Sequence, residues 1–249
     1  MEAIDSLEKL PFHTELAVII NCGTKWFTTL ALASAARHAA MPILLIDCES
    51  QDGSEDHFRQ LSDALDFSFY WLNWPLRPHG EALDQLFADI PAERVLLVDS
   101  DLEIVNDSLV GKMKEKLLTT EGAYGAGFLH SGGWMSAPDH YFPPHTAFYA
   151  ERMWIPLVLL DTQRIRRALD DGHSFLARKI YLEFPSAPRL ARFLSQRYRL
   201  PWIRNVRLPR KSNLPEDWPY PERPAFIDYD TGALIHRSLT QRQQGFAPL

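Results

Sequence analysis

The sequence predicts an α/β fold built on a mostly parallel central sheet, and three observations lead to that prediction. Short, continuously apolar segments alternate with segments of helical composition in the first half of the 249-residue chain. The apolar segments do not alternate with polar residues, as strands with one solvated face would. A polar loop follows each of them, as expected where parallel strands end at one edge of a sheet. Together these features are typical of a sheet covered by helices on both faces.

Four strands and three helices are expected in the first half. Each strand is an apolar, β-rich run, and each helix is a longer segment with helical composition. The expected strands are 15–21, 42–47, 67–74 and 94–99, and the expected helices are 25–39, 55–65 and 79–90.

The second half has a less regular pattern. A helix is expected at 107–118, a strand at 123–130, and a strand leading into a helix over 154–172. The segment 131–145 is rich in glycine, proline and aromatic residues and predicts a loop. The remaining expectations are a basic amphipathic helix at 187–200, irregular chain at 209–224, and a strand or turn followed by a helix entered near Asp230.

No internal repeat or linker divides the chain. We therefore expect a single domain over 1–249. The net charge of −6 does not indicate a nucleic-acid partner. Basic residues cluster between Arg189 and Lys211, either as a solvated surface or as a site for an anionic partner.

The two cysteines, Cys22 and Cys48, are interpreted as reduced thiols of a cytoplasmic protein. No apolar run approaches the ~20 residues that span a bilayer, so no transmembrane segment is expected.

Two carboxylates, Asp99 and Asp101, follow the apolar run Val95–Val98 directly. Alternate residues of an extended segment point to the same side, so the two side chains share one side of the strand end. Like charges repel unless a cation lies between them. A divalent cation with oxygen ligands is the natural partner. The alternative is an ordinary solvated turn.

The order of these motifs resembles family 2 of the GT-A fold glycosyltransferases. A strand is followed by a Ser-x-Asp-Gly-Ser loop at 50–54, then by Gly80 and Ala82 at a helix start, then by Asp99-Ser100-Asp101 as an Asp-x-Asp motif. The resemblance covers 15–110, and it implies a nucleotide-sugar-binding half at about 15–110 and an acceptor-binding half at about 111–249 within the single domain. It implies a GT-A fold, a metal-dependent enzyme, and transfer of a sugar from a nucleotide-diphosphate sugar, with a UDP-sugar favoured, to an acceptor hydroxyl.

The resemblance also implies roles for individual residues on the donor side. Asp101 would bind Mn²⁺ or Mg²⁺, and Asp99 would bind the ribose or a water on the metal. The remaining nucleotide-sugar contacts would come from Asp47, Asp52, His79, Gly80 and Ser100. His79 has an alternative role as a neutral helix cap, and Arg77 either reaches a phosphate or is solvated.

A carboxylate is needed to accept the proton of the acceptor hydroxyl in an inverting enzyme. Asp230 matches the family's base position, with Tyr229 in place of the usual glutamate, and Asp228 is the substitute. The alternative for Asp230 is a helix N-cap. GT-A enzymes often add a late histidine to the metal, which makes His236 a third metal candidate. Its alternative is an ordinary half-buried histidine.

The acceptor is expected to be a glycan, a lipid-linked glycan or a small molecule. Trp134, Asp139 and His140 are the acceptor-binding candidates, because they share a glycine- and proline-rich loop. For Trp134, core packing is the alternative.

Rival functions remain open. A retaining, glycogenin-like transferase has a similar acidic strand end but also a late His-x-x-Gly-x-Lys segment, which is missing here. A sugar-phosphate nucleotidyltransferase would have a glycine-rich basic loop after the first strand. A catalytically inactive nucleotide- or glycan-binding relative is suggested by Cys22, Cys48 and Tyr229, which depart from the family pattern. No Gly-x-Gly-x-x-Gly motif of a dinucleotide oxidoreductase follows the first strand.

Overall fold

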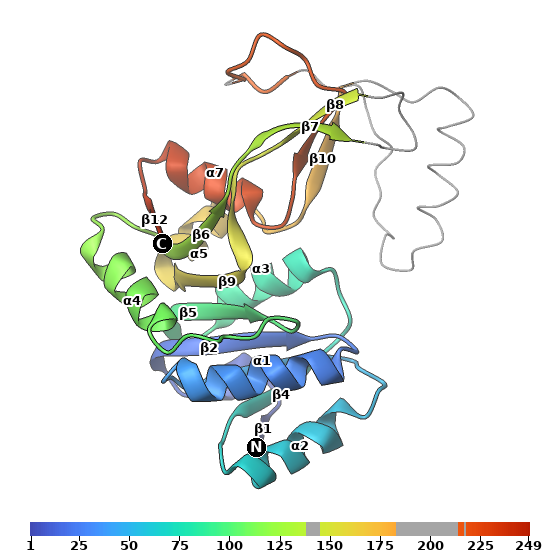
Figure 1. Ribbon diagram of the computed structural model, residues 1–249, viewed down its shortest axis with the longest axis vertical. Helices are drawn as coiled ribbons and strands as arrows, with labels where there is room; N and C mark the ends of the chain where they lie inside the picture. The colour runs from blue at the N-terminus through green and yellow to red at the C-terminus, as the bar shows by residue number, and fades with distance from the viewer. Residues whose placement is uncertain (138–144, 183–213, 217) are drawn as a thin grey trace.

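A computed structural model describes residues 1–137, 145–182, 214–216 and 218–249 of the chain. Its strands form an eight-stranded main sheet and a four-stranded second sheet, which projects from the main sheet at the top of Figure 1. The predicted α/β fold with a large, mostly parallel sheet flanked by helices is confirmed.

The main sheet contains eight strands in the order β1-β4-β3-β2-β5-β9-β6-β12. The first five strands in this order run parallel to one another, and β9 runs antiparallel to both β5 and β6. The bounds are β1 Glu2–Ile4, β2 His13–Asn21, β3 Ile43–Cys48, β4 Tyr70–Trp74, β5 Ala92–Asp99, β6 Gly125–His130, β9 Arg152–Asp161 and β12 Phe246–Pro248.

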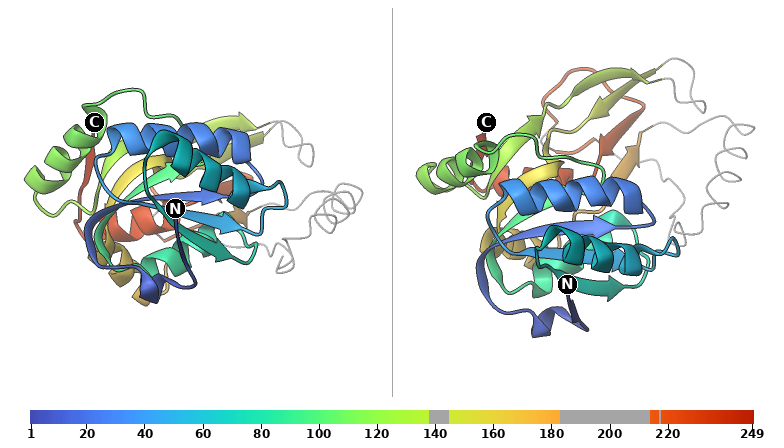
Figure 2. Two further views of the ribbon diagram at one scale, coloured as in Figure 1. Left: turned by 90° about the horizontal axis from the view of Figure 1, so that it is seen from below. Right: turned by 60° about the horizontal axis from the view of Figure 1, so that its bottom comes forward.

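Helices cover both faces of this sheet, and Figures 1 and 2 show the layers from three directions. Because strand residues alternate between faces, Leu44 packs in one apolar core with α3, α5 and α7, and Leu45 in the other with α1, α2 and α4. The bounds are α1 Lys25–His38, α2 Ser54–Leu65, α3 His79–Asp89, α4 Leu109–Thr119, α5 Thr162–Asp170 and α7 Ala233–Gln241, with a short 3₁₀ turn, η1, at Leu7–Lys9.

The second sheet has the order β10-β11-β8-β7. Its β8 runs antiparallel to β7 and parallel to β11, and β10 runs antiparallel to β11. The bounds are β7 Gly133–Ala137, β8 His145–Tyr149, β10 Arg178–Tyr181 and β11 Phe226–Tyr229.

One long hairpin joins the two sheets. In the main sheet His130 pairs with Arg152, and in the second sheet Gly133 pairs with Tyr149, so the two pairings keep the same register. The hairpin therefore continues from β6 and β9 into β7 and β8, and it bends between them. A β-carbon at Gly132 would lie 2.7 Å from the backbone nitrogen of Glu151, so only glycine fits the inside of this bend.

Most predicted elements of the described regions are confirmed with small shifts of their ends. The predicted loop at 131–145 is wrong for 133–137, because these residues pair with β8 and form β7. Sequence patterns also missed the short edge strands β1 and β12, which have too few residues for a periodic signal. The helix predicted at 187–200 lies outside the described residues.

Alanine substitutions at two neighbouring glycines test how tightly the bend is packed. We expect Gly132→Ala to destabilise the protein by about 1–3 kcal/mol, because the added methyl group meets backbone rather than a mobile side chain. Gly133→Ala is the matched control, since no atom lies within 4 Å of the position that its β-carbon would take. Urea unfolding of both variants measures the difference. Equal stability of the two variants would contradict a tightly packed bend.

Candidate functional site

Polar side chains gather at the carboxyl ends of the four central parallel strands. Asn21 at the end of β2 lies opposite Asp47 of β3, which lies opposite Asn73 of β4. On the other side of β2, Ile20 lies opposite Asp99 of β5. The predicted gathering of these loops at one edge of the sheet is confirmed, and it is the position where open α/β sheets bind ligands.

Asn21 organises the centre of this edge. Its side chain is fully buried, and its Nδ2 lies 2.6 Å from Asp47 Oδ1 and 3.0 Å from the hydroxyls of Ser50 and Ser54. Its Oδ1 accepts a hydrogen bond from Thr28 Oγ1 at 2.8 Å. A buried amide that connects the loop after β3 with α1 in this way keeps their relative positions fixed.

Asp47 is engaged by the protein itself. Its Oδ1 accepts from Asn21, and its Oδ2 accepts from the backbone N–H of Ser50 at 3.0 Å. With only 4% of the residue exposed, Asp47 holds the loop after β3 in place. The nucleotide contact predicted for Asp47 would have to be made alongside these bonds.

Asp52 orders the start of α2. Its carboxylate accepts hydrogen bonds from the backbone N–H of Lys25 at 3.2 Å and from the backbone N–H of Ser54 at 3.1 Å. Burial acts to raise the pKa of Asp52, but the hydrogen bonds from Ser54 and Lys25 outweigh it and hold the pKa below the ordinary value. Asp52 is therefore a charged residue that ties the loop after β3 to the start of α1.

Asp99 is the partly buried member of the acidic motif. His79 Nε2, at the start of α3, lies 4.0 Å from its Oδ1. Burial raises the pKa of Asp99; the charge of Asp101 raises it further, whereas His79 and Arg152 oppose the rise. An added cation would relieve the repulsion between the two carboxylates.

Ser100 and Asp101 form the turn after β5. Ser100 Oγ accepts a hydrogen bond from Thr24 Oγ1 at 3.0 Å, which links this turn to the loop after β2. The backbone N–H of Leu102 donates to the Asp99 carbonyl at 3.1 Å and closes the turn. Asp101 itself is exposed, so its carboxylate is accessible to a ligand.

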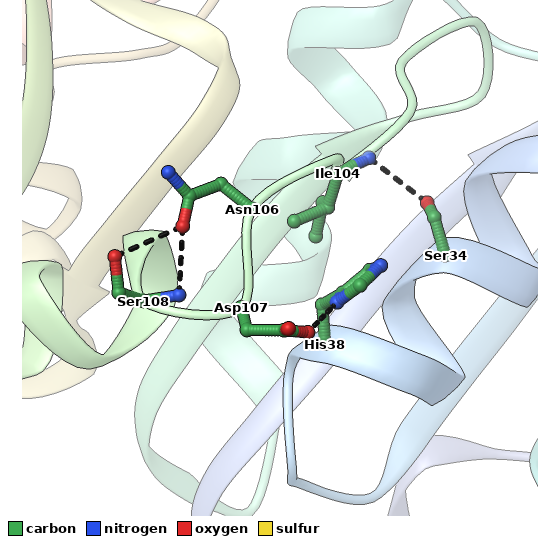
Figure 3. A network of polar contacts seen from close by, with 6 residues as sticks. All are labelled: Ser34, His38, Ile104, Asn106, Asp107 and Ser108. Carbon is green, nitrogen blue, oxygen red and sulfur yellow. Dashed lines mark hydrogen bonds and ion pairs between the residues drawn. The ribbon is translucent and has the colours of Figure 1, made fainter.

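The chain that follows Asp101 is fastened to α1 (Figure 3). The backbone N–H of Ile104 donates to Ser34 Oγ at 3.0 Å, and His38 contacts Asp107. Asn106 Oδ1 accepts from both the N–H and the hydroxyl of Ser108 at 2.9 Å, which orders the entry to α4. The acidic turn is thus held on both sides.

Gly80 lies where two backbones come into close contact. A β-carbon at this position would lie 2.6 Å from Leu176 Cα and 2.8 Å from the Phe175 carbonyl carbon. Asp84 of α3 holds the same segment, because its Oδ1 accepts from the Phe175 N–H at 2.7 Å. Gly80 therefore has a packing role beside its predicted one.

Arg77 precedes α3 and is in contact with protein groups. Its guanidinium contacts Gln85 and lies 5.3 Å from the centre of the Trp74 ring. The sequence predicts that Arg77 either reaches a phosphate or is solvated, and it does not predict this stacking on Trp74.

A second group of charges lies at the end of β11. Asp230 Oδ2 forms an ion pair with Arg152 at 2.9 Å, and Asp230 Oδ1 accepts from the Thr231 N–H at 2.8 Å. Asp230 does not act as the N-cap of α7, because the helix begins only at Ala233. Asp228 pairs with Lys179 at 3.2 Å.

Arg152 connects this group to the acidic motif. Burial raises the pKa of Asp228, and the charge of Arg152 opposes the rise at Asp228 as it does at Asp99. The bend of the hairpin places Arg152 at the start of β9, whose first residues lie beyond the carboxyl end of the antiparallel β5. The two acidic pairs, Asp99 with Asp101 and Asp228 with Asp230, therefore share one basic neighbour.

His236 is buried, and both of its ring nitrogens have protein partners. Nδ1 contacts the Tyr124 hydroxyl, and Nε2 lies 3.0 Å from Glu151 Oε1. The third metal ligand predicted at His236 is therefore not supported, because a metal would have to replace one of these contacts. Instead, the row Tyr124–His236–Glu151 anchors the residue that precedes Arg152.

Trp134 is the acceptor candidate that the structure describes, and it does not lie with these carboxylates. Trp134 packs edge-to-face against Phe148, Trp218 and Tyr220, with ring centres 5.6–6.0 Å apart. Trp134 pairs with Phe148, which pairs with Ile227, so all three point to one face of the second sheet and Asp228 to the other. Asp139 and His140 lie outside the described residues.

A Mg²⁺ or Mn²⁺ ion fits Asp99 and Asp101 as a two-carboxylate site. Within the described ranges no group of three or more His, Cys, Asp or Glu side chains could hold a metal. Two hard carboxylates nevertheless suffice for an ion that takes its other ligands from phosphate oxygens and water, which is how Mg²⁺ is usually bound. Such an ion would also offset the repulsion that raises the pKa of Asp99.

Sequence reasoning did not single out Arg152, Glu151, Lys179 or Tyr124. Arg152 and Glu151 stand between two apolar segments and carry no motif of their own. Their positions depend on the hairpin bend and on pairing between β8 and β11, which are distant in sequence. No local signal could have identified them.

Comparisons with known proteins place the chain among distant structures only. No protein-family model matches it, and no curated protein does. Among the described residues, no helix is long and apolar enough to cross a membrane.

Several solved structures match part of this chain. A mannosyltransferase from Pyrobaculum calidifontis, solved with GDP-Man and Mn²⁺, matches 62% of this chain and 46% of its own, at 12% identity and a TM-score of 0.47. A glucosyl-3-phosphoglycerate synthase from Mycobacterium tuberculosis, solved with Mn²⁺, UDP and glucosyl-3-phosphoglycerate, matches 76% of this chain and 67% of its own, at 14% identity and a TM-score of 0.43.

A 4-diphosphocytidyl-2C-methyl-D-erythritol synthase from Anaerococcus prevotii matches 64% of this chain and 75% of its own, at 13% identity and a TM-score of 0.47. This chain spans less than half of the length of the mannosyltransferase chain that it matches. At these identities the likeness concerns the fold alone, and the chemistry of this chain has to come from its own residues.

The Asn21 network predicts a large stability effect. We expect Asn21→Ala to lower the free energy of unfolding by about 3 kcal/mol, because the buried Asp47 carboxylate loses its donor. Asn73→Ala is the control, since Asn73 stands at the end of the neighbouring strand but is exposed. Urea denaturation compares the two variants. Losses of similar size would show that the network is not important for stability.

His236 predicts a pH dependence of stability. Burial lowers its pKa, against the opposing effect of Glu151, so the folded protein takes up this proton less readily than the unfolded chain does near pH 6.5. The stabilisation is therefore present above about pH 6.5 and is lost as the pH falls below it. We expect the melting temperature of the wild type to fall more steeply than that of His236→Gln between about pH 7.5 and 5.5.

His130→Gln is the control for this measurement, because it removes an exposed histidine from β6. Its melting temperature should follow the wild type across the same pH range. Parallel curves for His236→Gln and the wild type would rule out a titrating role for His236 in stability.

Proposed function

We propose that this protein is a metal-dependent glycosyltransferase that moves a sugar from a nucleotide-diphosphate sugar to an acceptor hydroxyl. The single observation that carries the proposal is that two acidic pairs, one at the end of a main-sheet strand and one at the end of a second-sheet strand, share one basic neighbour. Asp99 and Asp101 end β5, and Asp228 and Asp230 end β11, with Arg152 beside both pairs. One pair supports donor binding, and the other supports activation of the acceptor.

The donor side of the proposal rests on Asp99 and Asp101. These residues would hold Mn²⁺ or Mg²⁺, which would offset the charge of the leaving diphosphate. His79, 4.0 Å from Asp99 at the start of α3, would lie beside the same phosphates. The free N–H groups at this helix start also favour an anion. A UDP-sugar is the favoured donor.

The acceptor side rests on Asp230. Its half-exposed carboxylate would accept the proton of the acceptor hydroxyl while the hydroxyl oxygen bonds to the anomeric carbon of the sugar. The bond from that carbon to the diphosphate breaks, and its electron pair leaves with the phosphate oxygen. Attack from the side opposite the leaving group inverts the anomeric centre. Asp228 is the second candidate base, and Lys179 keeps it paired in this structure. A glycan, a lipid-linked glycan or a small molecule is the proposed acceptor.

A thermal-shift panel tests the donor site. UDP, GDP, dTDP and ADP would each be measured with and without Mn²⁺. A ligand at 100 times its Kd stabilises the folded state by about 2.7 kcal/mol, which shifts the melting temperature by several degrees. We expect one nucleotide to stabilise the wild type only with Mn²⁺, and Asp101→Asn to abolish the effect.

Glu103→Gln is the matched control, because it removes one exposed carboxylate two residues beyond the motif. It should keep the wild-type response. A response that survives in Asp101→Asn would remove the metal role of the motif. No response to any nucleotide at millimolar concentration would overturn the transferase proposal. Binding without any turnover of nucleotide sugars would instead favour the inactive nucleotide-binding relative.

A further inference from the structure

Arg152 is paired with Asp230, the residue proposed as the general base. Its guanidinium forms the 2.9 Å ion pair with Asp230 Oδ2, and the other oxygen of Asp230 is bound by the Thr231 N–H. Each carboxylate oxygen of Asp230 therefore already has a protein partner. Opening the pair would free the lone pair of Asp230 Oδ2 that Arg152 occupies, so that this oxygen could bind an acceptor hydroxyl.

The position of Arg152 is fixed by the fold and not by the ion pair alone. Its side chain is only 17% exposed, and its backbone belongs to the pair with His130 in the main sheet. The preceding residue, Glu151, is anchored to His236 Nε2 at 3.0 Å. Arg152 therefore stays near the acidic motif even when its partner changes.

Arg152 is also the cation best placed to change partners. Lys179 is paired with Asp228 on the second sheet, and His79 is 4.0 Å from Asp99 at the start of α3. Arg152 opens β9, which pairs with β5 as far as Val98, so it stands at the end of the sheet where Asp99 and Asp101 follow β5. A planar guanidinium binds phosphate oxygens through two parallel hydrogen bonds.

Resting on the proposed function, we infer that Arg152 exchanges Asp230 for the diphosphate of the donor, so that the base is released only when the donor is bound. The same residue then binds the leaving group and controls the base. The exchange imposes an order, with donor before acceptor. It also keeps Asp230 paired when no donor is present.

Competition for Arg152 gives a test that needs binding only. If Asp230 competes with phosphate, Asp230→Asn should bind UDP in the presence of Mn²⁺ about tenfold more tightly than the wild type, as expected when a charged hydrogen bond no longer competes. Arg152→Gln should bind about tenfold more weakly, and the double variant should show no gain over Arg152→Gln. Isothermal titration calorimetry with UDP and with inorganic pyrophosphate measures each affinity.

Two controls accompany these variants. Glu15→Gln removes one carboxylate from an ion pair with Arg94 and Lys114 at the opposite edge of the sheet, so it makes the same change in net charge. It should leave both affinities unchanged. Asp230→Ser removes the same charge with a different side chain and should reproduce the tightening, which covers a folding defect of either variant.

The outcomes separate the two proposals. A purely structural ion pair would weaken binding in both single variants, so unchanged or weaker UDP binding in Asp230→Asn and Asp230→Ser overturns the inference. If these two variants bind UDP more tightly but do not bind pyrophosphate more tightly, phosphate is not the new partner of Arg152. If the wild type binds none of UDP, GDP, dTDP and ADP with or without Mn²⁺, the proposed function fails, and the exchange fails with it.

Discussion

The bend of the long β-hairpin is the constraint on which the candidate site depends. The hairpin leaves the main sheet after His130 and enters the second sheet at Gly133, and it returns through Glu151 and Arg152. Backbone atoms of Glu151 lie so close to Gly132 that no side chain fits there. Without this bend, the acids that end β11 would not lie beside those that end β5.

The two sides of the edge are built by different means. On the donor side, a buried amide and carboxylate, Asn21 and Asp47, join loops that each follow a strand of the main sheet. On the other side, ion pairs of Arg152 and Lys179 hold Asp230 and Asp228. Hydrogen-bonded neutral donors give a fixed frame, whereas ion pairs can be exchanged for another anion. This difference matches the roles proposed for the two sides.

The sequence was sufficient for the α/β architecture and for the position of Asp99 and Asp101, because buried strands such as Val95–Val98 are continuous in sequence and carry their own signal. It was insufficient for the second sheet. Its strands are short, and β8 pairs with β11 across almost eighty residues of chain, as in the pair Tyr149 and Asp228. The contacts of His236 were hidden for a similar reason, since its partners Tyr124 and Glu151 are visible only in three dimensions. The hydrogen bonds that engage Asp47 were hidden for the same reason.

The fastening of the chain after Asp101 has a thermodynamic consequence. Ser34 and His38 of α1 hold that segment, and Thr24 holds Ser100. A site whose backbone is already ordered loses little conformational entropy when it binds, so more of the interaction energy is expressed as affinity. The acidic turn is preorganised in this sense, and its affinity for a cation should therefore reflect its charges and not the cost of ordering a loop.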